Sequence, residues 1–356
     1  MSLWVDRYRP ASLDDLTYHE KLTDQLKRLA ESGEFPHLLV YGPPGAGKKT
    51  RVVSVLRELY GPGVEKLKID LREFVTPSGK KLEINVVSSN YHLEMTPSDV
   101  GIYDRVVIQD LIKEIAQTQQ VDSNAKRAFK VVVFNEADSL SRDAQAALRR
   151  TMEKYMGNLR VILCCESSSK IISPIRSRCL LVRVASPSME EVCAVLEKIA
   201  VKQGFDLPAP LARRIADFAG GNLRKAVLSL EALHVQNGNR SPLTSDLEPT
   251  LTDWEVFIRD LATLILGEQT PARLAMVRGK LYELLTHCIP ASIVLKTLAF
   301  ELIRNVDGQL KPAIVADAAE FEHRLRIGSK AIFHLEAFVA RFMSVYKGYL
   351  IEVSGM

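Results

Sequence analysis

The sequence predicts an α/β nucleotide-binding domain followed by helical domains, and three observations support this fold class. A glycine-rich loop lies between a short apolar segment, 38–41, and a helical pattern over 51–60. The continuous apolar segments 130–134 and 161–165 are typical of buried parallel strands. Beyond residue 185, the apolar residues follow helical spacing. Strands that alternate with helices favour a parallel sheet with helices on both faces.

Length and composition set the limits of this prediction. The chain has 356 residues, which fits two or three domains, and its 47% hydrophobic and 25% charged residues are those of an ordinary soluble protein. No apolar segment approaches the ~20 residues of a membrane span, and no signal-peptide core is found, so we expect a nuclear or cytoplasmic protein. Five cysteines without CxxC spacing support neither a disulfide framework nor a zinc site.

The glycine-rich loop is typical of a phosphate-binding loop. Its glycines let backbone N–H groups turn inward, the following helix adds partial positive charge, and Lys48 can reach the outer phosphates. We therefore predict that ATP or ADP binds here. The predicted loop residues are Gly42, Pro43, Pro44, Gly45, Ala46, Gly47, Lys48, Lys49 and Thr50.

Two positions depart from the chemistry of an active phosphate-loop ATPase. The motif requires Ser or Thr directly after Lys48 to hold magnesium, but Lys49 stands there, and Thr50 is turned by about 100° along the helix. The strand 130–134 ends at Asn135-Glu136, where an acidic residue would hold the metal and a glutamate would activate water. Asn135 brings no charge. These changes predict a site that binds nucleotide with magnesium weak or absent and turns it over poorly, and no other metal site is predicted.

The remaining elements of the first domain follow in order. A helical pattern begins near His19, and a hairpin is expected around residues 76–79. A further helix begins near Asp104, and another spans 143–155 with an apolar stripe that leaves its arginines on the other face. The segment 173–179 is expected to be a short loop that carries two arginines and closes the domain.

The rest of the chain is predicted to be helical. Ser188 and Glu191 form a capping-box pattern before a first helix, a second is expected over 210–219, and a third begins at Asn222. A polar linker follows, and about five helices are expected from Thr252 onward. No catalytic pattern is found in these five helices, which favours an assembly surface.

The combination of residues 4–10, 42–50, 143–155 and Ser177-Arg178-Cys179 resembles the small subunits of replication factor C, the eukaryotic clamp loader of the AAA+ superfamily. The resemblance covers essentially the whole chain. The lysine-substituted loop, with 91–94 and 281–290, resembles the subunit type at the end of the five-membered arc away from the large subunit. It implies an AAA+ α/β domain over 1–184, a three-helix lid over 185–240, a linker over 241–251 and a helical oligomerisation collar over 252–356.

The resemblance also implies roles for individual residues. Arg178 matches the arginine finger that enters the neighbouring subunit's site, and Arg224 matches the lid arginine that touches phosphate in its own site. The position of the asparagine that helps to orient water in active members is Glu166 here, so Glu136 is not expected to work in its own site. The residues that match the segment packed on adenine are Val5, Tyr8, Arg9, Pro10 and Thr17.

The family function is to use ATP to open the sliding clamp and load it on primer-template DNA during nuclear replication and repair. The implied partners are four other loader subunits, the sliding clamp and DNA, with alternative large subunits and no membrane. Candidate DNA contacts, electrostatic and independent of sequence, are Arg105, Lys113 and Arg149. An alternative hypothesis stays open at this point: a self-sufficient AAA+ ATPase in which Thr50 and Glu136 restore hydrolysis.

Overall fold

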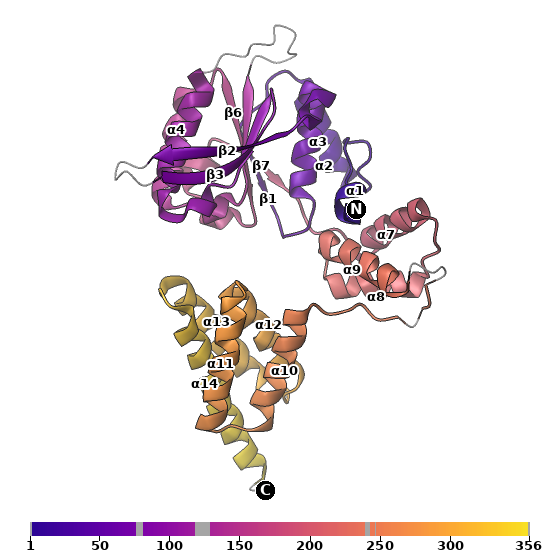
Figure 1. Cartoon of the computed structure of the whole chain (residues 1–356), viewed down its shortest axis with the longest axis vertical. Coiled ribbons are helices and arrows are strands. Elements are labelled where there is room, and N and C mark those ends of the chain that lie inside the picture. The colour runs from indigo at the N-terminus through magenta and orange to yellow at the C-terminus, as the bar shows by residue number, and fades with distance from the viewer. Residues whose placement is uncertain (1, 76–80, 118–128, 239–242, 246, 355–356) are drawn as a thin grey trace. The chain divides into compact units, whose positions relative to one another are not determined.

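The chain forms two compact units, Met1–Pro249 and Thr250–Met356 (Figure 1). The computed structural model describes residues 2–75, 81–117, 129–238, 243–245 and 247–354. Within these ranges no helix has the length and apolar character needed to cross a membrane.

A mixed sheet forms the centre of the first unit, and the described residues contribute seven strands in the order β2-β3-β4-β5-β6-β1-β7. Strands β4, β5, β6, β1 and β7 are parallel, whereas β2 and β3 form an antiparallel hairpin at one edge. The strand bounds are β1 Leu38–Tyr41, β2 Lys68–Val75, β3 Lys81–Ser88, β4 His92–Met95, β5 Lys130–Phe134, β6 Leu159–Cys165 and β7 Leu180–Arg183. The three predicted parallel strands and the predicted hairpin are confirmed, whereas β4 and β7 were not predicted.

Helices cover both faces of the sheet, as predicted, and Figure 1 shows α4 on one side with α2 and α3 on the other. Alternate strand residues separate the two layers: Leu39 and Val132 join the core under α4 and α5, whereas Val40 and Val131 join the core under α2 and α3. The helix bounds are α2 Glu20–Glu31, α3 Lys48–Tyr60, α4 Asp104–Gln117, α5 Arg142–Lys154 and α6 Ser173–Arg176. Short 3₁₀ turns span Pro62–Glu65, Pro97–Tyr103, Ala137–Ser139 and Ser168–Lys170.

The segment before β7 differs from its prediction. It was expected to be a loop, but Ser173–Arg176 forms the one-turn helix α6 with a proline in its first turn. Proline fits that position because the first helical N–H groups have no intrahelical acceptor. Arg178 lies two residues after this helix, and its backbone N–H donates to the Ile175 carbonyl at 3.0 Å.

Three helices form the lid part of the first unit: α7 Met189–Gln203, α8 Ala209–Ala219 and α9 Leu223–Gln236. The predicted capping box at Ser188 is present, with Glu191 bonded back to the Ser188 backbone. The N-terminal arm contains the short helix α1, Trp4–Arg7, and packs on this lid. The Trp4 ring stacks on Phe205 with centroids 6.0 Å apart, and the Trp4 backbone N–H donates to the Glu231 carboxylate at 3.0 Å.

The second unit is helical throughout its described residues and buries an apolar core of its own. Its helices are α10 Asp253–Gly267, α11 Pro271–Thr286, α12 Ala291–Arg304, α13 Lys311–Ile327 and α14 Ala331–Ser354. They agree with the five helices expected from the sequence. Their breaks follow the glycines and prolines, because Gly267 ends α10 and Pro290 caps the start of α12.

Candidate nucleotide site

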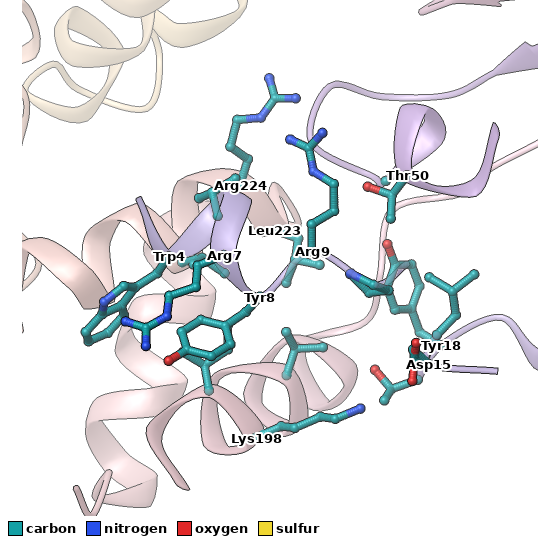
Figure 2. A pocket seen from close by; sticks show the side chains of 18 of the residues that line it. Trp4, Arg7, Tyr8, Arg9, Asp15, Tyr18, Thr50, Lys198, Leu223 and Arg224 are labelled. Atoms are coloured by element: carbon teal, nitrogen blue, oxygen red, sulfur yellow. The ribbon is translucent and has the colours of Figure 1, made fainter. Parts of the chain in front are cut away.

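A cavity of about 290 Å³ lies within the first unit, where the N-terminal arm, the glycine-rich loop and the lid helices meet (Figure 2). It brings together residues from three separate stretches of sequence that the resemblance assigned to nucleotide binding. Those that line the cavity are Val5, Tyr8, Arg9, Pro10, Thr17, Gly45, Gly47, Thr50 and Arg224. The other predicted loop residues, Gly42, Pro43, Pro44, Ala46, Lys48 and Lys49, belong to the same loop and helix start but are not lining residues.

The glycine-rich loop has a conformation that side chains would prevent. Gly45 and Gly47 have φ angles of 72° and 84°, in the left-handed region that favours glycine. A Cβ atom on Gly45 would lie 1.8 Å from the Asn222 side-chain oxygen, and one on Gly47 would lie 2.2 Å from the Tyr18 hydroxyl. Asn222 caps α9 by accepting the Lys225 N–H at 3.1 Å. The loop is therefore packed directly against the start of the lid helix that carries Arg224.

Lys48 lies inside the curve of the loop. Its Nζ donates to the carbonyl oxygens of Gly42 at 2.6 Å and Pro43 at 2.9 Å. Burial lowers the pKa of Lys48, and the nearby Glu166 carboxylate opposes this shift. A phosphate group is a charged acceptor and forms a stronger hydrogen bond with an ammonium than a carbonyl oxygen does. Lys48 is thus placed to exchange these two carbonyls for phosphate oxygens.

Cationic and apolar side chains both line the cavity. Figure 2 shows Arg9 and Arg224 pointing to the side of the cavity on which Thr50 lies. Arg9 also donates to Asp6 at 2.9 Å, which holds its guanidinium on the arm. Tyr8 and Leu223 supply apolar surface from the arm and the lid. Further cations, Arg7 and Lys198, lie on the Tyr8 side of the cavity. A lining that combines cations with aromatic and apolar surface suits a ligand that has anionic groups and a flat ring, which is the chemistry of a nucleotide.

Several residues that line the cavity were not predicted from the sequence, and neither was Arg51, which positions Tyr18. The missed residues that the structure adds include Tyr18, Lys198, Ile199, Leu223 and Val227. The lid residues reach the cavity only through tertiary packing, so no local pattern identifies them. Tyr18 follows Thr17 directly, and its aromatic side chain was the one available clue.

A buried arginine fixes the Tyr18 segment to α3. Arg51 is 1% exposed and donates to the Tyr18 carbonyl at 2.9 Å and to the Thr23 hydroxyl at 3.1 Å. Its guanidinium also lies 4.7 Å from the centre of the Tyr18 ring. The Tyr18 hydroxyl in turn donates to the Ala46 carbonyl at 3.0 Å. Arg51 therefore links the arm side of the cavity to the glycine-rich loop.

The residues at the magnesium position do not fit a magnesium ion. Lys49, in the first turn of α3, forms an ion pair with Glu94 of β4. Asn135, which follows β5, donates its side-chain N–H to the same Glu94 oxygen at 2.7 Å. Glu94 has a side chain that is 9% exposed, so this carboxylate is committed to an ammonium and an amide. The described residues contain no cluster of three or more His, Cys, Asp or Glu side chains that could hold a metal.

The two glutamates near the loop are exposed. Glu136 follows β5 with a φ of 49°, an uncommon conformation for a residue other than glycine. Glu166 directly follows β6. Cys164 of β6 is buried, and burial raises the pKa of its thiol to about 12, so the thiol is neutral at physiological pH.

Arg178 lies outside this cavity. Its Nη2 forms an ion pair with Glu153 of α5 at 2.6 Å, and its Nη1 donates to the Pro174 carbonyl at 2.8 Å. Arg149 approaches the same Glu153 oxygen at 3.4 Å. The Arg178 side chain is 38% exposed, so a group from another molecule can reach it.

The other candidate DNA contacts are on α4. Arg105 is exposed in its first turn. The side chain of Lys113 lies outside the described residues.

Comparison with known protein families gives three matches along the chain. Residues 38–186 match "ATPase family associated with various cellular activities (AAA)", and residues 194–235 match "RCF1/5-like, AAA+ ATPase lid domain". Residues 254–350 match "Replication factor C subunit 3, C-terminal domain". The three matches follow the order in which the sheet, the lid and the second helical unit occur in the fold.

Similar proteins cover nearly the whole chain. Replication factor C subunit 5 of Neurospora crassa is 60% identical over 353 residues, which is 99% of both chains. Replication factor C subunit 3 of Homo sapiens is 58% identical over 350 residues, which is 98% of both chains. Among solved structures, a RuvB Holliday junction branch migration motor from Thermotoga maritima has a TM-score of 0.51 at 15% identity, covering 77% of this chain and 85% of that one. That likeness shows the fold alone.

Proposed function

The chain belongs to the small subunits of replication factor C. From this premise we propose that it is a clamp-loader subunit whose bound nucleotide has mainly a structural role. We also propose that the chain assists the ATPase site of a neighbouring subunit. The AAA+ fold implies nucleotide binding. The residues proposed to bind ATP or ADP are those of the glycine-rich loop, the arm and Arg224. The proposed partners are the other loader subunits, the sliding clamp and primer-template DNA in the nucleus.

One observation carries the proposal that this chain acts in trans. Arg178 is exposed and lies outside the cavity of its own chain, so it cannot contact a nucleotide bound there without rearrangement. Its bonds to Glu153 and to the Pro174 carbonyl orient the guanidinium before a partner arrives. An arginine that reaches a transferring phosphoryl group contributes about 10³–10⁵ in rate in related systems. We assign this role to Arg178 toward the neighbouring subunit.

The substitutions at the magnesium position support slow turnover in the chain's own site. Phosphoryl transfer depends on a metal that bridges the outer phosphates and on a positioned water. Lys49 and Asn135 replace both usual supports of that metal, and Glu166 replaces the asparagine that positions water in active members. Glu136 then has no bound metal to work beside. A nucleotide held here would act through its contacts with the arm, the loop and the lid.

We propose DNA binding from the family of the chain and from two exposed arginine side chains. Arg105 and Arg149 are exposed on α4 and α5, which suits contact with phosphates irrespective of sequence. Arg149 also pairs with Glu153, the residue that holds Arg178. We propose the collar helices α10 to α14 as the surface that assembles the loader.

The test is the DNA- and clamp-stimulated ATPase rate of the reconstituted five-subunit complex. We expect Arg178→Ala in this chain to remove a large part of the turnover and Lys48→Ala to leave most of it. Arg176→Ala, two residues earlier in α6, serves as the matched control and should leave the rate unchanged. Gel filtration of each complex confirms that all five subunits remain assembled.

The alternative function is an ATPase that works in its own site. It predicts that Lys48→Ala causes the larger loss in an intact complex, and that the purified chain alone hydrolyses ATP when magnesium is present. Either result would contradict the proposal that Lys49 and Asn135 make turnover slow in the chain's own site. Thr50 lines the cavity and is the one hydroxyl of the loop, so Thr50→Val should also abolish that activity if the alternative is correct.

A further inference from the structure

The sequence position whose hydroxyl would hold magnesium carries a cationic side chain instead. Lys49 directly follows Lys48, the phosphate-loop lysine, and its ammonium forms an ion pair with the Glu94 carboxylate. Asn135, the substituted residue directly after β5, donates its side-chain N–H to the same carboxylate oxygen. Lys49 and Asn135 are 86 residues apart in sequence, and both contact the buried Glu94 carboxylate. We call Lys49, Glu94 and Asn135 the cation triad.

The backbone explains why these three side chains meet. Glu94 is the third residue of β4, and β4 lies beside β5 in parallel register, with Met95 opposite Phe134. The Asn135 N–H donates to the Met95 carbonyl at 2.9 Å, which places Asn135 at the end of the strand next to Glu94. Leu93 and Met95 belong to the core under α4, so Glu94 points to the opposite face, toward the start of α3.

The Lys49 ammonium of the triad is half exposed, so a ligand can still contact it. Glu94 is an acceptor that has a 9% exposed side chain, whereas Lys49 has a 47% exposed side chain. An ammonium has three donors, and the pair with Glu94 uses only part of this capacity. An ionised carboxylate only accepts, so the Asn135 amide turns its NH₂ group toward Glu94. The triad thus holds a half-exposed ammonium in the first turn of α3, directly after the glycine-rich loop, by pairing it with a buried anion.

We propose that the Lys49 ammonium, held by Glu94 and Asn135, replaces the divalent cation beside the outer phosphates, so that this site binds nucleotide free of magnesium. The inference rests on the proposed nucleotide binding. A point charge can neutralise part of the phosphate charge but cannot supply the octahedral oxygen coordination that magnesium uses to orient phosphates for transfer. The same three residues therefore favour retention of the nucleotide and disfavour its hydrolysis.

The experiment measures the affinity of a fluorescent ADP analogue and a fluorescent ATP analogue for the full-length chain, with millimolar magnesium and with EDTA. For the natural chain, we expect removal of magnesium to change the dissociation constant by less than about threefold. For Lys49→Thr, we expect the constant in EDTA to rise by about tenfold or more, the effect of losing one partly screened charge contact. Added magnesium should recover much of that loss in Lys49→Thr with Asn135→Asp, which restores both usual ligands.

Matched variants separate the failure of this inference from the failure of nucleotide binding. Lys66→Thr makes the same exchange at an exposed position outside the cavity and should behave as the natural chain, whereas Lys48→Ala should weaken binding under both conditions. Because Lys49→Thr could perturb the fold through unpaired Glu94, Lys49→Thr with Glu94→Gln provides a version without the buried charge, and circular dichroism checks each variant.

Each outcome has a definite meaning. A natural chain that binds at least about tenfold more weakly in EDTA would overturn the cation triad while leaving nucleotide binding intact. Equal affinity of Lys49→Thr and the natural chain in EDTA would also overturn it, because another group would then carry the charge. No binding of either analogue under any condition would overturn the proposed nucleotide site itself, and the inference with it.

Discussion

Replacing Arg51 tests whether the buried link between the arm and the glycine-rich loop stabilises the first unit. Arg51 is 1% exposed, and its guanidinium makes two hydrogen bonds and a contact with the Tyr18 ring at 4.7 Å. Arg51→Ala removes all three contacts and leaves the Tyr18 carbonyl without this donor. Arg57→Ala on the same helix is the matched control, since it breaks only a surface ion pair with Glu65.

The expected magnitude comes from opposing contributions. Hydrogen bonds from a charged donor contribute about 1.5–3 kcal/mol each, and a desolvated cation–π contact contributes about 2 kcal/mol. Burying the guanidinium costs several kcal/mol, which offsets roughly half of this gain. We therefore expect Arg51→Ala to lower the free energy of unfolding by about 3 kcal/mol, and Arg57→Ala by about 0–1 kcal/mol because its ion pair is exposed.

Scanning calorimetry of the full chain measures this difference. For a unit of this size, each kcal/mol moves the melting temperature by roughly 2–4 °C, so the transition of the first unit should fall by about 6–12 °C. The transition of the second unit, which has a separate core, should not move and provides an internal control. If Arg51→Ala and Arg57→Ala lower the first transition equally, the proposed link between Tyr18 and α3 contributes nothing measurable.

Two further predictions concern a charge contact and a titration. Glu153→Gln removes the carboxylate that pairs with Arg178. The ATPase rate of the reconstituted complex should therefore fall several-fold, while the assembly of the complex is unchanged. An unchanged rate would refute a positioning role for Glu153. Burial lowers the pKa of His37 to about 4, and its Nδ1 accepts the Val161 N–H at 3.0 Å, so the folded state holds the ring neutral. The unfolded state takes up the proton first, so the free energy of unfolding should fall by about 3 kcal/mol as pH drops from about 6.5 to about 4, measured by urea unfolding. His37→Gln should flatten that pH dependence, and a natural chain with no pH dependence in this range would refute it.

The sequence predicts long and strongly patterned elements better than short ones. The apolar segments 38–41 and 130–134 match β1 and β5 because every residue in them favours a buried strand. Strand β4 was missed since His92-Leu93-Glu94-Met95 alternates polar and apolar residues over only four positions, although all four are buried. The polar members are tolerated there because each has a partner, Ser89 for His92 and Lys49 for Glu94.

Residues of the site were predictable where a motif or a resemblance named them, and not where tertiary packing alone brings them in. Gly45, Gly47 and Arg224 could be proposed from the loop and from the first turn of the third lid helix. Lys198 and Ile199 lie on the face of α7 that meets the arm, which no local pattern encodes. Arg51 looked like one more polar residue of an amphipathic helix, because its burial depends on a segment more than 20 residues earlier.

The contacts of the loop give the nucleotide a means to act without being hydrolysed. Gly45 is packed against Asn222 at the start of α9, and the same cavity is lined by the arm, the loop and the lid. A ligand that touches all three favours the arrangement in which they are close, in proportion to its extra affinity for that arrangement. Hydrolysis would release this constraint at every cycle, whereas a held nucleotide keeps it. Under the proposed function, a site in which Lys49 and Asn135 replace the magnesium supports would therefore be well suited to hold the lid against the loop and the arm.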